Sequence, residues 1–110
     1  MKLPFKAVIA REKVTDYLLV RQVRSDKSAF LAKGGFTSAN PELLMVAIRS
    51  LLVNDATQVD ENEFGRYFEI VGVLVGSGGV ALRVKTVWMT EHLSGVTKFI
   101  TLIPVETLRP

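Results

Sequence analysis

The spacing of hydrophobic positions changes near residue 56 of this 110-residue chain. Before that point, apolar residues recur three and four positions apart, which is the period of one helix face. After it, apolar and polar residues alternate or run continuously, as they do in strands. Val14, Tyr17 and Leu18 carry the first helical stripe and predict a helix over residues 11–20.

Two further helices are predicted before the change of period. A short one carries Ala29, Phe30 and Leu31; Ser25 or Asp26 caps its start, and the run 33–35 (KGG) ends it, because glycine readily adopts the left-handed conformation. The third begins at Asn40, an N-cap residue, with Pro41 at the first helical position, and ends at 54–55. Its broad apolar face consists of Leu43, Leu44, Ala47, Ile48, Leu51 and Leu52.

The remainder of the chain predicts an antiparallel meander. The pattern predicts an edge strand at 57–60, an acidic turn at 61–65, long strands at 66–75 and 80–90 around the turn 77–79 (SGG), a turn at 91–96 and a last strand at 97–105. We therefore predict an α+β fold in one domain, residues 1–110, with three N-terminal helices packed on one face of a C-terminal antiparallel sheet of about four strands.

Strand alternation divides the returning strand 80–90 between two faces. One set points toward the helices: Val80, Leu82, Val84, Thr86 and Trp88. The other points away from them: Ala81, Arg83, Lys85, Val87 and Met89.

Composition limits the function classes. The chain is 48% hydrophobic and 23% charged, which is ordinary for a folded protein, and it has no cysteine and one histidine. We therefore predict no metal site, no cofactor and no disulfide, in keeping with a reducing cytoplasm. No apolar run approaches the roughly 20 residues that span a bilayer, and the start MKLPFKAVIA lacks the apolar stretch of a signal peptide. We predict a cytoplasmic protein without a membrane partner.

Charge is unevenly distributed along the chain. The net charge is +5 over residues 1–33, −4 over 34–79 and +2 over 80–110, giving the total of +3. One interpretation is an ordinary solvated surface. The other is a basic face that binds a polyanion, of which RNA is the leading candidate.

Arg83 and Lys85 are candidates for RNA binding or catalysis. They lie two apart on one strand, so they share a face at a separation of roughly 7 Å, and Lys98 can join them from the neighbouring strand. Such a cluster suits a phosphate group; the alternative is a solvated outer sheet face. Trp88 either stacks on a base or, as an inward-facing tryptophan, belongs to the core.

His92 is a weaker candidate. A histidine beside Glu91 could act in acid–base chemistry. The two residues are adjacent in a predicted turn, however, and the alternative is an exposed loop residue.

Several short pieces, in order along the chain, resemble a family of small bacterial domains of unknown function. They are 14–19 (VTDYLL), 27–31 (KSAFL), 35–37 (GFT), 40–41 (NP), 64–67 (FGRY), 86–88 (TVW) and 100–104 (ITLIP). The order of helices then sheet is also similar to the barnase, colicin and RelE-type ribonucleases, by fold analogy. The resemblance implies that Lys27, Arg66, Thr86, Trp88 and Thr101 occupy motif positions.

Two hypotheses follow. The first is a binding module of a toxin–antitoxin-like system, with a small protein partner or as a homodimer, and the pattern slightly favours it. The second is a metal-independent ribonuclease-like toxin that uses Lys and Arg side chains, with Lys27, Arg66, Arg83, Lys85 and Thr101 as catalytic candidates. An enzyme is expected to gather Arg66, Arg83 and Lys85 in a concave site, whereas a module disperses them around a flat apolar patch.

Overall fold

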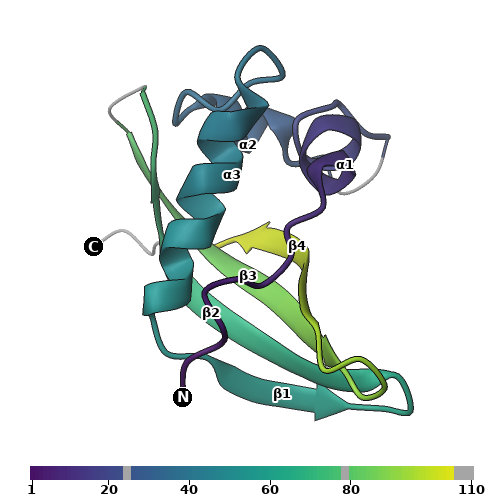
Figure 1. Cartoon of the computed structure of the whole chain (residues 1–110). Coiled ribbons are helices and arrows are strands. Elements are labelled where there is room, and N and C mark those ends of the chain that lie inside the picture. Colours follow the sequence, from purple (N-terminus) through teal and green to yellow (C-terminus); the bar gives the residue numbers. More distant parts are fainter. Residues whose placement is uncertain (24–25, 78–79, 106–110) are drawn as a thin grey trace.

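The computed structural model describes residues 1–23, 26–77 and 80–105, in which four strands form one antiparallel sheet (Figure 1). The strands are β1 Thr57–Glu61, β2 Gly65–Val75, β3 Ala81–Glu91 and β4 Thr97–Pro104. Each strand pairs with its sequence neighbour, in the order β1-β2-β3-β4. The α+β class and the four-stranded antiparallel sheet are confirmed. The predicted turn residues Gly78 and Gly79 lie outside the described residues.

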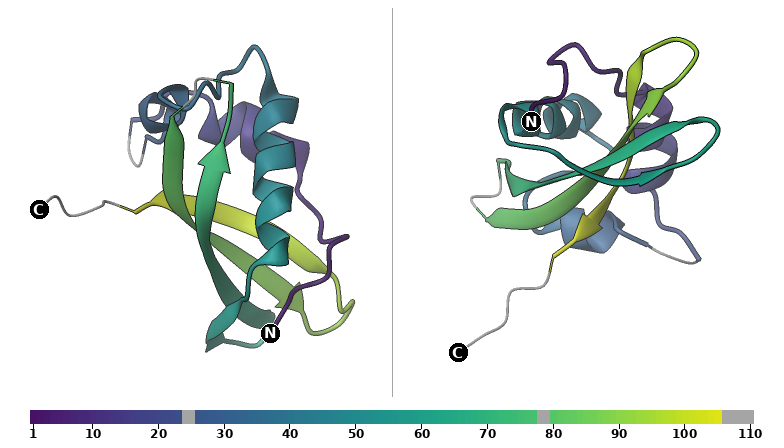
Figure 2. Two further views of the ribbon diagram at one scale, coloured as in Figure 1. Left: turned by 90° about the vertical axis from the view of Figure 1, so that its left-hand side faces the viewer. Right: turned by 90° about the horizontal axis from the view of Figure 1, so that it is seen from below.

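The pairing of β2 with β3 determines which side chains enter the core. It runs without interruption from Gly65↔Glu91 to Val75↔Ala81, and both strands twist strongly (Figure 2). The buried side chains of the two strands alternate along them: Phe68, Ile70, Leu74, Leu82, Val84, Thr86 and Trp88. The predicted inward face is therefore correct for β3 except at Val80, which precedes the strand and is 47% exposed.

The helices are less regular than predicted. The first is an α-helical turn, α1 Arg11–Lys13, that continues as the π-helix η1 Val14–Leu18 and ends before residue 20. The second, α2 Ser28–Ala32, has five residues, and the third, α3 Pro41–Ser50, has ten and continues into the 3-10 turn η2 Leu51–Val53.

Packing of three helices on one sheet face is not confirmed. Only α3 lies along the sheet, where it and η2 contact β2 (Figure 1). The segment α1–η1 packs against α3. Two features after α2 end that helix: the φ of Gly35 is +88°, and Phe36 N–H donates a 3.1 Å bond to the Leu31 carbonyl. Because these two helices are short, each buries only a few side chains, Val14, Leu18 and Leu31 among them.

The helix starts differ in detail from the predicted caps. Pro41 occupies the first helical position, but the Asn40 carboxamide oxygen accepts a 3.0 Å bond from the N–H of Thr37 rather than capping α3. The N-cap position of α2 is Lys27, and Asp26 accepts a 3.3 Å bond from the N–H of Ser28. Ser25 lies outside the described residues.

The N-terminal segment forms backbone hydrogen bonds with part of the outer edge of β4. Val8 N–H donates to the Thr97 carbonyl, and Phe99 N–H donates to the Val8 carbonyl, each at 2.8 Å. The beginning of β4 is thereby paired on both sides, whereas its end faces the α1–η1 segment. Across the described residues, no helix is both long and apolar enough to span a membrane.

Candidate functional site

A pocket of about 800 Å³ lies between the α1–η1 segment, the residues before α2, and the end of β4. We call it the Lys27 pocket. Its lining residues are Glu12, Lys13, Tyr17, Asp26, Lys27, Ile100, Thr101, Ile103 and Pro104. Three separate parts of the chain thus supply one concave surface, in the size range of ligand sites.

Lys27 links the three parts. Its Nζ donates to the hydroxyl of Thr101 at 3.2 Å and to that of Tyr17 at 3.3 Å, and it lies 5.1 Å from the centroid of the Tyr17 ring. Lys27 and Thr101 were both candidates from the family resemblance, and the structure brings them together. Tyr17 was missed as a site residue, because its place in a helical apolar stripe explained it as core; its presence in the piece 14–19 was the available signal.

A β-bulge explains why Thr101 reaches the pocket. The pairing of β3 with β4 shifts between Val87↔Thr101 and Trp88↔Phe99, which leaves Ile100 as an extra residue on β4. A bulge bends its strand and redirects neighbouring side chains. As a result, the consecutive residues Ile100 and Thr101 both line the Lys27 pocket.

The positive charge of Lys27 faces neutral oxygen atoms. Among the described residues, no carboxylate lies within 4.0 Å of its Nζ. Asp26 is in the lining, but its Oδ1 is held by the hydroxyl of Ser28 at 2.8 Å and the N–H of Gln22 at 3.1 Å. These bonds, that of Ser28 foremost, lower the pKa of Asp26 below its ordinary value. The ammonium is therefore available to an anionic ligand.

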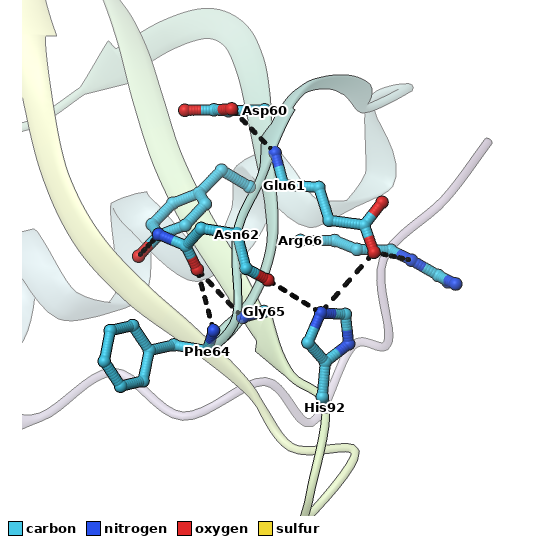
Figure 3. Close-up of polar contacts among 8 residues, drawn as sticks. Asp60, Glu61, Asn62, Phe64, Gly65, Arg66 and His92 are labelled. Atoms are coloured by element: carbon cyan, nitrogen blue, oxygen red, sulfur yellow. Dashed lines mark hydrogen bonds and ion pairs between the residues drawn. The ribbon is translucent and has the colours of Figure 1, made fainter.

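Arg66 lies elsewhere, in a cluster that joins the β1–β2 and β3–β4 turns (Figure 3). Its Nε is 3.6 Å from Glu61 Oε2, and the same oxygen is 3.4 Å from His92 Nε2. His92 Nε2 is also 2.9 Å from the Asn62 carbonyl. Because Nε2 faces two acceptor oxygens, it carries the proton in this arrangement.

His92 is therefore not paired with Glu91, its neighbour in the sequence. Glu91 instead contacts Lys98 Nζ at 2.8 Å and the hydroxyl of Ser94 at 2.7 Å, and these contacts lower its pKa, with the Lys98 bond first. His92 precedes β4, whereas Thr101 lies in its second half, so the cluster and the Lys27 pocket are at different ends of that strand. The contacts of this exposed cluster connect the β1–β2 turn to the β3–β4 turn.

Arg83 and Lys85 are on the sheet face that the helices leave open. Lys85 Nζ is 3.5 Å from Glu69 Oε2, and Arg83 is opposite Val73 in the register. Neither lines the Lys27 pocket, nor does Lys98. The same face exposes Val71, Val73, Val75 and Ile103 at 41–68%. Arg83 and Lys85 thus lie beside an apolar patch, and Arg66 lies apart from them in the turn cluster, so the three cations do not gather in one concave site.

Trp88 has to be corrected as a nucleic-acid-binding candidate. It is fully buried, with its ring packed edge-on against Phe99 at a centroid distance of 5.3 Å. Its Nε1–H donates to the hydroxyl of Thr86, which is also buried. An indole enclosed on all sides offers no face to a base, so Trp88 and Thr86 are core residues.

The described part of the chain holds no group of three or more His, Cys, Asp or Glu side chains placed to bind a metal ion. The Lys27 pocket itself offers the ammonium groups of Lys13 and Lys27, the hydroxyls of Tyr17 and Thr101, and the carboxylates of Glu12 and Asp26.

Residues 3–106 match the family model of a Domain of unknown function (DUF6883). No curated protein matches the chain. A chain in the solved "Contact-dependent growth inhibition toxin - immunity protein complex from Klebsiella pneumoniae 342" is similar, with a TM-score of 0.70 and 16% identity over 93% of this chain and 96% of that one. At this identity, the similarity shows a shared fold.

Proposed function

We propose that this chain, which belongs to the DUF6883 family, is the toxin member of a toxin–immunity-type pair and cleaves RNA in the Lys27 pocket without a metal ion. The observation that carries the proposal is the placement of the Lys27 ammonium between the hydroxyls of Tyr17 and Thr101 in a concave surface. The fold shared with one chain of the toxin–immunity protein complex named above supports the toxin–immunity setting.

The groups in the pocket suit attack by a ribose 2′-hydroxyl on the adjacent phosphate. The O2′–P bond forms and the P–O5′ bond breaks, so charge accumulates on the non-bridging oxygens. An ammonium and hydroxyls fixed before the reaction stabilise that charge most effectively where water is limited. In our proposal Lys27 binds these oxygens, and Tyr17 and Thr101 hold its side chain in position.

Two proton transfers complete the step. Glu12 is our candidate to accept the 2′ proton, because it lines the pocket while Asp26 Oδ1 is already hydrogen-bonded. The Tyr17 hydroxyl, 3.3 Å from Lys27 Nζ, is our candidate to protonate the departing O5′. Exchange with solvent then restores both residues.

The test is cleavage of end-labelled total RNA by the purified protein in excess EDTA. We expect Lys27→Ala to lose about a hundredfold or more of the rate, the size seen when one charge-stabilising donor is removed. Lys33→Ala is the matched control, because Lys33 is an exposed lysine just after α2 that does not line the pocket. Lack of cleavage by folded wild-type protein contradicts the proposal.

A second candidate function is a non-catalytic protein-binding module, favoured by the exposed residues Val71, Val73 and Val75 of the open sheet face. Affinity purification with three baits separates the two functions: wild type, Val73→Asp and Lys27→Ala. A partner lost with Val73→Asp and retained with Lys27→Ala supports binding through the open sheet face. A partner retained by all three baits counts against that surface.

A further inference from the structure

The Lys27 pocket combines charged side chains with an aliphatic wall. Besides the polar groups of Lys27 and Thr101, the lining contains Ile100, Ile103 and Pro104, which lie next to Thr101 on β4. A ligand that satisfies both parts carries an anionic group within a few ångströms of a flat, weakly polar body. A nucleotide has this composition, with the phosphate and the base joined through the ribose.

The charges around the pocket limit how much of a nucleic acid it accepts. Lys13 and Lys27 supply two positive charges to the lining, and Glu12 and Asp26 supply two negative ones. Proteins that bind duplexes through their backbone contact several phosphates with a run of cations. Here the two carboxylates balance the two lysines, so the lining presents no run of cations to successive phosphates.

The accessibility of the bases also limits which nucleic acid fits the pocket. The bases of an RNA helix are stacked, and its deep, narrow major groove does not admit side chains. A base reaches an aliphatic wall inside a pocket only when it is unpaired or extruded from the stack, and extrusion from a duplex costs a few kcal/mol. An unpaired nucleotide avoids this cost.

We infer that the Lys27 pocket selects one unpaired nucleotide of a single-stranded RNA, with its phosphate on Lys27 and its base against Ile100, Ile103 and Pro104. This inference deepens the proposed function and rests on it. It assigns substrate selection to the aliphatic wall and not to a basic surface.

The experiment compares two end-labelled RNAs, a stem–loop and the same loop sequence annealed to its complement, in excess EDTA. We expect cuts in the loop and cleavage of the duplex slower by at least about tenfold, because the duplex must first unstack a base. Equal rates on the two RNAs overturn the inference and leave the cleavage function standing.

A variant pair tests the wall directly. Ile103→Ser removes a wall residue that is 41% exposed, and Val59→Ser makes a similar change at a 48% exposed position on β1, the opposite edge strand. We expect Ile103→Ser to raise KM for the stem–loop by about tenfold, the lower end of the effect of losing an apolar group from a pocket, because the residue is partly exposed. Val59→Ser is expected to match wild type. Equal KM values for the two variants overturn the assignment of the wall.

Fluorescence anisotropy with the same two RNAs separates failure of the inference from failure of the proposed function. Folded protein that cuts neither RNA contradicts the cleavage proposal. If that protein still binds the single strand more tightly than the duplex, and Lys27→Ala loses this preference, the selectivity of the pocket is supported on its own. Absence of any such preference overturns the inference.

Discussion

Trp88 and Thr86 form a buried hydrogen bond of 2.8 Å from the indole Nε1–H to the threonine hydroxyl. The hydroxyl in turn donates to the Ile70 carbonyl at 2.9 Å, so one threonine satisfies an indole on its own strand and a carbonyl on β2. Both side chains of the pair are fully buried. Thr86 thus places a polar side chain within the core and still meets the requirement that buried polar groups be paired.

Replacing this threonine tests the stability assigned to the bond. Thr86→Val keeps the shape but leaves the Trp88 N–H without its partner, so we expect a loss of about 1–3 kcal/mol in the free energy of unfolding. Urea denaturation followed by tryptophan fluorescence measures it. Thr86→Ser retains the hydroxyl and is expected to lose only about 1 kcal/mol, for one buried methyl group. A Val variant as stable as wild type contradicts this account.

The hydroxyls around Lys27 give a second prediction. Thr101→Val and Tyr17→Phe each remove one oxygen that holds the ammonium. We expect Thr101→Val to slow RNA cleavage by about tenfold or more, because it mispositions Lys27. Tyr17→Phe is expected to slow it by about a hundredfold or more, because it also removes the proposed acid, while Tm stays close to that of wild type in both variants. Thr57→Val, an exposed substitution on β1, is the control. Unchanged rates in both pocket variants would remove these hydroxyls from the mechanism.

The double variant Arg83→Ala/Lys85→Ala distinguishes the open sheet face from the Lys27 pocket. Neither side chain lines the pocket, so we expect the cleavage rate to remain within about twofold of wild type, as for surface substitutions away from a site. The end-labelled RNA assay measures this rate. A loss as large as that of Lys27→Ala would place catalysis on the open face instead.

The Glu91–Lys98 pair predicts a pH dependence of stability. Because Lys98 and Ser94 lower the pKa of Glu91 in the folded state, the stabilisation by this carboxylate is complete above its ordinary value of 4.5 and is lost as pH falls through the lower, folded value. Urea titrations of wild type and Glu91→Gln are therefore expected to differ at neutral pH and to converge in acid.

Glu63→Gln provides the control for this titration. Glu63 is exposed, and within the described residues it takes part in no ion pair. Its substitution removes a carboxylate without breaking an ion pair, so it measures the effect of losing one negative charge alone. A difference between wild type and Glu91→Gln that persists undiminished in acid would contradict the role of the ion pair.

Some site residues could be predicted and others could not. Lys27 and Thr101 were found through a motif resemblance, but their contact joins residues 74 positions apart, and no local pattern reports such a distance. His92 shows the same limit: sequence adjacency suggested Glu91, whereas the turns bring Glu61 to within 3.4 Å. Neighbouring residues in a chain often point apart, and distant turns can meet.

The sequence by itself determined the antiparallel meander, the inward side of β3 and the stop of α2, because these depend on local periods and on glycine's backbone freedom. Only the tertiary structure decided that α3 alone lies along the sheet and that Lys27 meets Tyr17 and Thr101. The physical reason is that these outcomes depend on how helices of marginal length dock, and on a one-residue bulge in β4 that redirects Thr101.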